Sequence, residues 1–174
     1  EFLQHVYDRI VEAGEAVGLA HAGYHALNSL RLEKAYRHWS HDITDEDSPL
    51  EAGLDFVIKF DKPGGFIGRD ALLAQQEQGV SRHLLQLKLN DPGPLIYHNE
   101  PIWRGDEIVG HITSAAYGHT LGGAVGLGYV SAGTGAPADS VLGDTYEVEV
   151  ACERFSADVS LRPLYDPDNA KIRR

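Results

Sequence analysis

The chain has 174 residues, of which 43% are hydrophobic and 24% charged, a composition typical of globular proteins. Its formal net charge of −11 argues against nucleic acid and anionic membrane surfaces as partners, because both require clustered Lys and Arg, and the sequence contains no such cluster. A single cysteine, Cys152, excludes an internal disulfide and a CxxC metal site.

The surroundings of Cys152 indicate the cellular compartment of the protein, and the start of the chain indicates whether it is part of a longer polypeptide. Cys152 ends an alternating run that begins at Tyr146, so a buried strand thiol is favoured over a nucleophile. An unpaired cysteine favours a reducing compartment, and we expect the cytoplasm, or the mitochondrial matrix in a eukaryote. The chain lacks methionine and opens within a helical pattern, which predicts a fragment of a longer polypeptide.

Helical spacing dominates the first part of the chain. Apolar residues recur every three or four positions and predict a first helix that ends at Gly18, followed by a shorter helix over residues 21–29. Leucine then alternates with charge in the run Leu30-Arg31-Leu32-Glu33-Lys34. This period of two predicts a half-buried strand over residues 31–36, with Arg31 and Glu33 on one face. Spacing alone leaves an ion pair and a polar ligand equally open as explanations for that face.

The next stretch mixes polar loops with one strand and one helix. Residues 40–53 are acidic and predict a loop with one helical turn near Pro49. Alternation over residues 54–60 predicts a second strand, which Lys62-Pro63-Gly64-Gly65 ends. A third helix is expected over residues 70–78, with Gly79 as its cap.

After Gly79 the helical periodicity gives way to short β-type runs. They include the alternating leucines at 85, 87 and 89 and the runs 101–104, 107–112, 124–130, 145–152 and 155–161, with a hairpin turn at Gly105-Asp106. Short strands at this spacing predict a small antiparallel barrel or sandwich. The sequence therefore predicts two domains, residues 1–80 and 81–174.

Several ordered motifs resemble the glycine-cleavage T-protein (aminomethyltransferase) family. They are L-R-L-E-K, P-L-E-A-G-L and F-I-G-R-x-A-L in the first part, and V-G-H-I-T-S, L-G-Y-V and P-L-Y-D-P in the second. These motifs are most similar to the C-terminal parts of dimethylglycine and sarcosine dehydrogenases. The resemblance implies an α+β fold, in which the end of a folate-binding α+β domain precedes a small antiparallel Greek-key β-barrel.

The resemblance implies tetrahydrofolate-dependent one-carbon transfer. The expected partners are folate, an N-methyl amine or aminomethyl donor, and the rest of the parent polypeptide, in which a missing N-terminal domain carries FAD. The expected product is 5,10-methylenetetrahydrofolate. Alternatives are a glycine-cleavage aminomethyltransferase, a folate-dependent demethylase, and a non-catalytic folate-binding or interaction module. The family's catalytic Asp lies upstream of this fragment, so we expect no catalytic residue here, and the fragment alone should be inactive and bind folate weakly or not at all.

The resemblance also implies folate-binding residues, each with a structural alternative. Glu33 matches the glutamate that accepts two N–H groups from the pterin edge, and its alternative is a salt bridge to Arg31 or Lys34. Arg31 orients Glu33 or reaches acid groups elsewhere. Tyr36 stacks on a flat ring or packs in the core.

Two further residues complete the predicted folate site. Lys62 stands where the family carries a basic residue, often arginine, and it binds the folate or is a solvated turn lysine. Tyr165 lines the folate channel or pins the C-terminal tail to the barrel.

No metal site is expected. The pairs His21/His25 and His38/His41 have metal-like spacing, but no H-E-x-x-H motif exists. Residues 42–47 are rich in acids but lack the central glycine of an EF-hand loop, so we interpret them as a solvated acidic loop.

Overall fold

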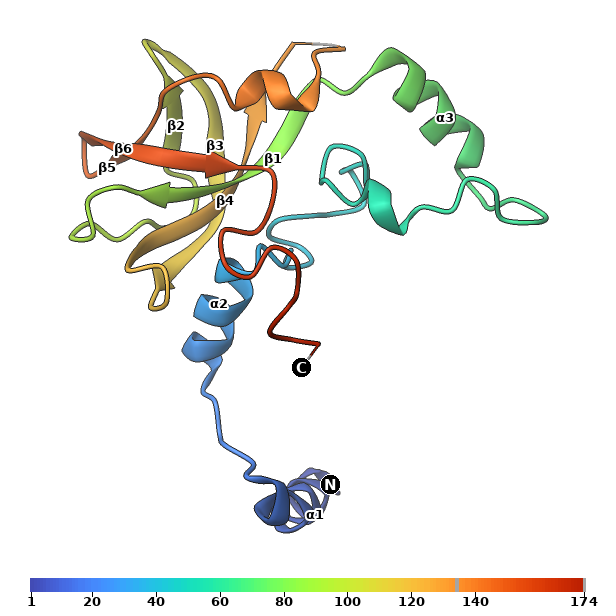
Figure 1. Ribbon diagram of the computed structural model, residues 1–174, viewed down its shortest axis with the longest axis vertical. Helices are drawn as coiled ribbons and strands as arrows, with labels where there is room; N and C mark the ends of the chain where they lie inside the picture. Colours follow the sequence, from blue (N-terminus) through green and yellow to red (C-terminus); the bar gives the residue numbers. More distant parts are fainter. Residues whose placement is uncertain (134, 174) are drawn as a thin grey trace.

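A computed structural model describes residues 1–133 and 135–173 of the chain. Its centre is a closed antiparallel barrel with the strand order β1-β4-β3-β2-β5-β6 (Figure 1). The strands are β1 (Arg82–Leu89), β2 (Pro101–Arg104), β3 (Glu107–Gly118), β4 (Gly123–Ser131), β5 (Tyr146–Val150) and β6 (Glu153–Ser160). Strands β2, β3 and β4 follow one another as neighbours, and β1 lies beside β4, which is the Greek-key arrangement. The predicted α+β fold with a Greek-key barrel is thereby confirmed.

Strand β1 is buried on both faces, and this explains how the barrel supports other elements. Leu85, Leu87 and Leu89 point into the barrel core. Leu84 and Gln86 point outward, yet both are almost fully buried, because other parts of the chain cover this side of the strand. The outer face of β1 is therefore a second packing surface.

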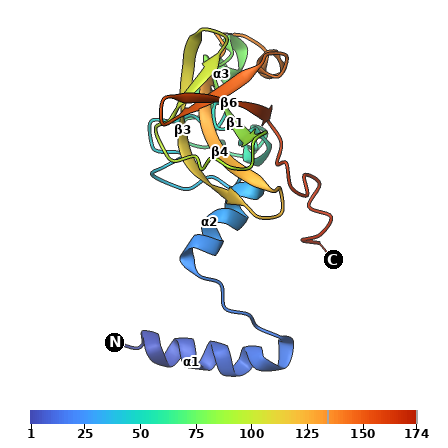
Figure 2. The same cartoon turned by 90° about the vertical axis from the view of Figure 1, so that its left-hand side faces the viewer.

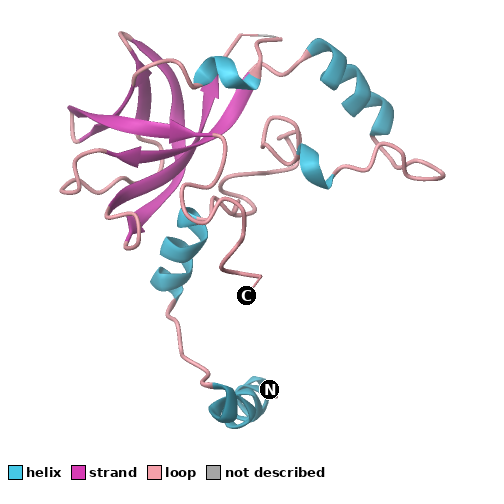
Figure 3. Ribbon diagram, in the orientation of Figure 1, coloured by secondary structure: helices cyan, strands magenta, loops and turns pink. Residues whose placement is uncertain are grey.

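The helical elements lie outside the barrel (Figures 1 and 3). They are α1 (Leu3–Gly14), the 3-10 turn η1 (Glu15–Val17), α2 (Tyr24–Glu33), η2 (Asp55–Val57), α3 (Arg69–Gln78) and η3 (Ala138–Val141). Figure 2 shows α1 well away from the barrel, while α2 meets it end-on. The first helix is α-helical as far as Gly14, and the 3-10 turn η1 continues it to the predicted stop at Gly18, which has a left-handed φ of 72°. The third helix ends at its predicted cap Gly79, which has a positive φ of 78°.

The predicted strand over residues 31–36 is wrong, because α2 runs through Glu33. The alternating run is too short to decide between a strand and a helix end. The helix closes with a Schellman motif, in which Tyr36 N–H donates to Arg31 C=O at 2.8 Å and Ala35 N–H donates to Leu32 C=O at 2.9 Å. Ala35 takes the left-handed conformation that glycine usually supplies, with φ 52°.

Two further expectations are corrected. Residues 54–60 form the 3-10 turn η2 with flanking turns, because no strand among the described residues of this half is available to pair with them. Cys152 is exposed rather than buried, because β5 ends at Val150 and Ala151-Cys152 form the tight turn to β6. Both turn residues have positive φ, as a type I′ hairpin requires.

Across the described ranges, none of the helices combines the length and apolar character required to cross a lipid bilayer.

Candidate functional site

The last turn of α2 brings Glu33 onto the outer face of the barrel. Ser29, Leu32 and Glu33 recur at helical spacing and are all buried. The Ser29 hydroxyl donates to the Tyr117 carbonyl at 2.6 Å, and Leu32 packs in a small apolar cluster with Leu84 and Leu127. Glu33 thus extends from a helix end that is held on the barrel by both packing and hydrogen bonding.

The carboxylate of Glu33 is held by the turn between β3 and β4. Its Oε1 accepts hydrogen bonds from the backbone N–H groups of Thr120, at 2.6 Å, and Leu121, at 3.0 Å. Gly118 lies close by, and a Cβ added there would stand 3.2 Å from Oε1. Among the residues that the structure describes, no hydrogen bond reaches Oε2. One oxygen of a buried carboxylate is therefore still able to accept a donor.

Neither cation that the sequence offered as a partner pairs with Glu33. Arg31 Nη1 lies 2.7 Å from Asp42 Oδ2, and Lys34 Nζ lies 3.6 Å from Asp166 Oδ2. The salt-bridge alternative for Glu33 is thereby contradicted. Backbone N–H groups stabilise the charge of this carboxylate instead.

Arg31 is the centre of a separate buried network. Its Nη1 also donates to Ser114 at 2.9 Å, and Asp42 accepts further hydrogen bonds from Thr113, Ser114 and the His38 N–H. The side chain of Asp42 has no exposed surface, so its interpretation as part of a solvated loop is wrong. The network fastens the loop after α2 to strand β3.

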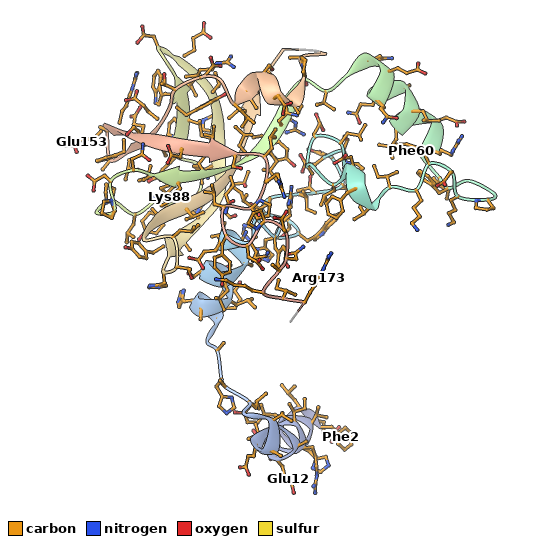
Figure 4. All side chains as sticks on the ribbon, in the orientation of Figure 1. Phe2, Glu12, Phe60, Lys88, Glu153 and Arg173 are labelled. Atoms are coloured by element: carbon orange, nitrogen blue, oxygen red, sulfur yellow. The ribbon has the colours of Figure 1, made fainter. Side chains whose placement is uncertain are left out.

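Tyr165 lies next to Glu33, whereas Lys62 does not. The Tyr165 N–H donates to the Glu33 carbonyl at 3.3 Å. Lys171 Nζ lies 3.2 Å from the Tyr165 hydroxyl and 4.6 Å from its ring centre. Lys62 is exposed in the loop between η2 and α3, just beyond Phe60, on the side of the molecule away from α2 (Figure 4).

Tyr36 is half exposed and lines a groove of about 520 Å³ between the end of α2 and the C-terminal residues. Arg37 lines the same groove and donates to the carbonyls of Ala35, Ala52 and Gly53. Burial lowers the pKa of Arg37 from its usual value. The groove therefore combines aromatic surface with a cation whose donors already serve the protein.

Several residues around Glu33 escaped the sequence-based prediction. They are Thr120 and Leu121, which bind the carboxylate, and Gln86 and Lys34, which bind the adjoining main chain and C-terminal residues. Gln86 carried a usable signal, because it is a polar residue between leucines in a strand. The backbone amides carried none, since a backbone N–H is common to almost every residue.

Two family models match the chain. The one described as the GCVT N-terminal domain matches residues 1–62, and the one described as the glycine cleavage T-protein C-terminal barrel domain matches residues 82–166. A 4-methylaminobutanoate oxidase (formaldehyde-forming) of Paenarthrobacter nicotinovorans is 44% identical over 97% of this chain. The mitochondrial sarcosine dehydrogenase of Mus musculus is 38% identical over 97% of this chain.

The chain spans about a fifth of these two relatives, covering 20% and 18% of their lengths. A crystal structure of the glycine cleavage system aminomethyltransferase T from Bartonella henselae has the same fold. It matches with a TM-score of 0.70 and 26% identity, covering 82% of this chain and 38% of that one.

Proposed function

The chain belongs to the glycine cleavage T-protein family, and we propose that it is the folate-binding part of an enzyme that transfers one-carbon units to tetrahydrofolate. The two relatives compared above are an oxidase of a methylamino acid and a dehydrogenase of sarcosine, which supports an N-methyl amine as the one-carbon donor. The proposed product is 5,10-methylenetetrahydrofolate, with FAD bound by another part of the parent polypeptide. The mitochondrial relative supports the matrix as the compartment in a eukaryote.

The observation that carries this proposal is the buried Glu33 carboxylate with its free oxygen. A carboxylate oxygen offers two lone-pair sites, and the two backbone amides already use those of Oε1. Oε2 therefore remains for the N–H donors on the edge of a pterin ring. In this arrangement Oε2 accepts both of the pterin N–H groups that the resemblance implies for Glu33.

The other predicted residues take different parts in the proposed site. The Tyr165 backbone adjoins Glu33, and Tyr36 lines the groove beside the end of α2. We assign to these two rings the aromatic surface on which a flat ring or its aryl extension rests. Arg31 acts indirectly, because its guanidinium is committed to Asp42 and Ser114. Lys62 serves only the outer end of a long ligand, since the loop that follows Phe60 lies away from α2.

The chemistry divides between the ligand and the protein. Tetrahydrofolate supplies a nucleophilic nitrogen that accepts the one-carbon unit. The residues of this chain hold the ring in position, and accurate placement of reacting groups is itself a large source of rate acceleration. We assign the proton-transferring carboxylate to the parent polypeptide outside these 174 residues.

The direct test is calorimetry of folinic acid with the longest natural polypeptide that carries these residues, compared with its Glu33→Gln variant. Loss of a charge-assisted hydrogen bond to a buried carboxylate should cost on the order of 1.5–3 kcal/mol, or roughly ten- to a hundredfold in affinity. Glu46→Gln is the matched control, because Glu46 is an exposed acid. Unchanged affinity of the Glu33→Gln variant would remove Glu33 from the site, and no binding by the unmodified protein would refute the proposal.

The donor requires a separate measurement on the same polypeptide. Product analysis with sarcosine, dimethylglycine and an aminomethyl-lipoyl protein distinguishes the proposed enzyme from an aminomethyltransferase. We expect methylenetetrahydrofolate from an N-methyl amine. Product from the lipoyl donor alone would favour the aminomethyltransferase, and folate binding without any product would favour a non-catalytic module.

A further inference from the structure

Gln86 occupies an unusual place, between the end of α2 and the C-terminal residues. Its side chain lies on the outer face of β1 and is 2% exposed, although its neighbours along the strand are leucines. Its Nε2 donates to the carbonyls of Leu32, at 2.6 Å, and Glu33, at 3.2 Å. Its Oε1 accepts the N–H of Leu164 at 2.7 Å. A buried amide whose hydrogen bonds all go to backbone groups of two other segments joins those segments.

These contacts complete the hydrogen bonding at the end of α2. The last four carbonyls of a helix have no partner within it and must be satisfied from outside. The Schellman motif and the Lys34 N–H serve the carbonyls of residues 30–32. The Glu33 carbonyl depends on two donors from elsewhere, Gln86 Nε2 and the Tyr165 N–H. The carbonyl of Glu33 is thus held by parts of the molecule outside α2.

Lys34 fastens the same segment from the other side. Its Nζ donates to the Asp166 carbonyl at 2.6 Å and to the Asn169 side-chain oxygen at 2.7 Å. The C-terminal segment, residues 164–169, is therefore bound to the end of α2 at Tyr165, Asp166 and Asn169 and to β1 at Leu164. Gln86 joins this segment, strand β1 and the last turn of α2.

We propose that Gln86 is a positioning residue for Glu33. By fixing the Leu32 and Glu33 carbonyls relative to β1, it sets the orientation of the last helical turn, and hence the place of the free Oε2. This inference rests on the proposed folate site. Without the Gln86 amide, the Glu33 carbonyl keeps only the longer hydrogen bond from Tyr165, and the Leu164 N–H loses its acceptor. Small displacements of a binding group weaken recognition strongly.

The test is a double-mutant cycle on folinic acid affinity in the natural polypeptide. Gln86→Leu removes both hydrogen-bonding ends of the side chain at similar volume. We expect it to weaken binding about tenfold. This is the effect of losing one well-placed hydrogen bond between the ligand and the Glu33 carboxylate. In the Glu33→Gln background the same substitution should change affinity less than about twofold, because its effect passes through the carboxylate.

Two controls keep the result interpretable. Gln78→Leu, at the exposed end of α3, should leave affinity unchanged. Gln86→Met also lacks both hydrogen-bonding ends and is uncharged and flexible, so it should show the same dependence on Glu33, and it replaces Gln86→Leu if that variant does not fold.

The outcomes separate this inference from the proposed function. If substituting Gln86 reduces folinic acid affinity equally with Glu33 intact and in the Glu33→Gln background, Gln86 is a general structural residue and the inference is overturned. If the substitution reduces affinity in neither background, the inference is also overturned. Both of these results leave the Glu33 contact standing if Glu33→Gln alone weakens binding. Failure of the unmodified protein to bind folinic acid would overturn the function and the inference together.

Discussion

Two buried carboxylates in this molecule are satisfied in different ways. Asp42 receives a guanidinium, two hydroxyls and a backbone N–H, which fills the acceptor capacity of its two oxygens. Glu33 receives two backbone N–H groups on one oxygen and, from the described part of the chain, no side-chain cation. A fully bonded ion pair serves stability, whereas a buried charge with an open acceptor has the properties of a binding group.

Removing the Asp42 carboxylate should destabilise the fold without touching Glu33. Asp42→Ala leaves the Arg31 guanidinium, whose side chain is 13% exposed, without its counter-charge. Breaking a buried pair on one side costs about 3–5 kcal/mol, so we expect a loss near the lower limit in the free energy of unfolding measured by urea titration. Asp45→Ala, an exposed acid in the same loop, should change it by less than about 0.5 kcal/mol. Equal effects from both substitutions would mean that Arg31 finds other partners.

The elements that meet at Glu33 are a helix end and a hairpin turn, and each contributes backbone groups. The last turn of α2 supplies the side chain, and the β3–β4 turn supplies two N–H groups to it. Gly118, at the end of β3, has no Cβ, and this permits the close approach of the two elements. The site therefore depends on the fit between two elements whose contacting residues are far apart in the sequence.

Filling this space is expected to disturb both stability and binding. In Gly118→Ala the new Cβ would stand 2.8 Å from Val125 Cγ2 and 3.2 Å from Glu33 Oε1. Overpacking of this kind costs typically about 1–3 kcal/mol. We expect a lower unfolding midpoint and weaker folinic acid binding, measured on the same samples. Gly143→Ala is the control, since an added Cβ there meets nothing within 4 Å. A variant with normal stability and affinity would show that the helix end is free to move aside.

At the scale of the molecule, the barrel is the surface on which distant parts of the chain come together. Residues near the start, in α2, and near the end, in the C-terminal segment, both lie on β1 through Gln86 (Figure 1). Helix α1 shows the contrast, because its apolar residues Leu3 and Ile10 remain 81% and 56% exposed. The elements that form the candidate site are therefore those that pack against the barrel.

The ion pair between Asp166 of the C-terminal segment and Lys34, at the end of α2, should make stability depend on pH. Partial desolvation tends to raise the pKa of Asp166, but the Lys171 and Ala170 amides and the Lys34 ammonium together lower it below its ordinary value of 3.8. Because the folded-state pKa is lowered, its stabilising effect is complete above the unfolded value and declines as pH falls through the folded-state pKa. Asp166→Asn should therefore lower the thermal midpoint at pH 7, and this difference should shrink below about pH 4. A difference that is constant across this range would assign the effect of the substitution to lost hydrogen bonds alone.

The sequence by itself determined the barrel half of the molecule and the helices that have clear caps. The β-type runs predicted all six strands, although the run over residues 107–112 covered only the first half of β3. The runs were visible because each strand turns apolar side chains toward the barrel core. Gly18 and Gly79 marked helix ends, because only glycine adopts positive φ freely. The ordered motifs also indicated the family.

The tertiary structure decided the local form and the partners of the candidate site. The run Leu30–Lys34 alternates like a strand, yet it forms the end of a helix and its cap, because Ser29, Leu32 and Glu33 pack on a common surface of the barrel. The acid at 42 is buried rather than solvated, since its partners come from α2 and β3. The free oxygen of Glu33 and the role of Gln86 arise from contacts between residues more than fifty positions apart. No local pattern encodes such contacts, because burial and hydrogen-bond partners are set by which segments the fold brings together.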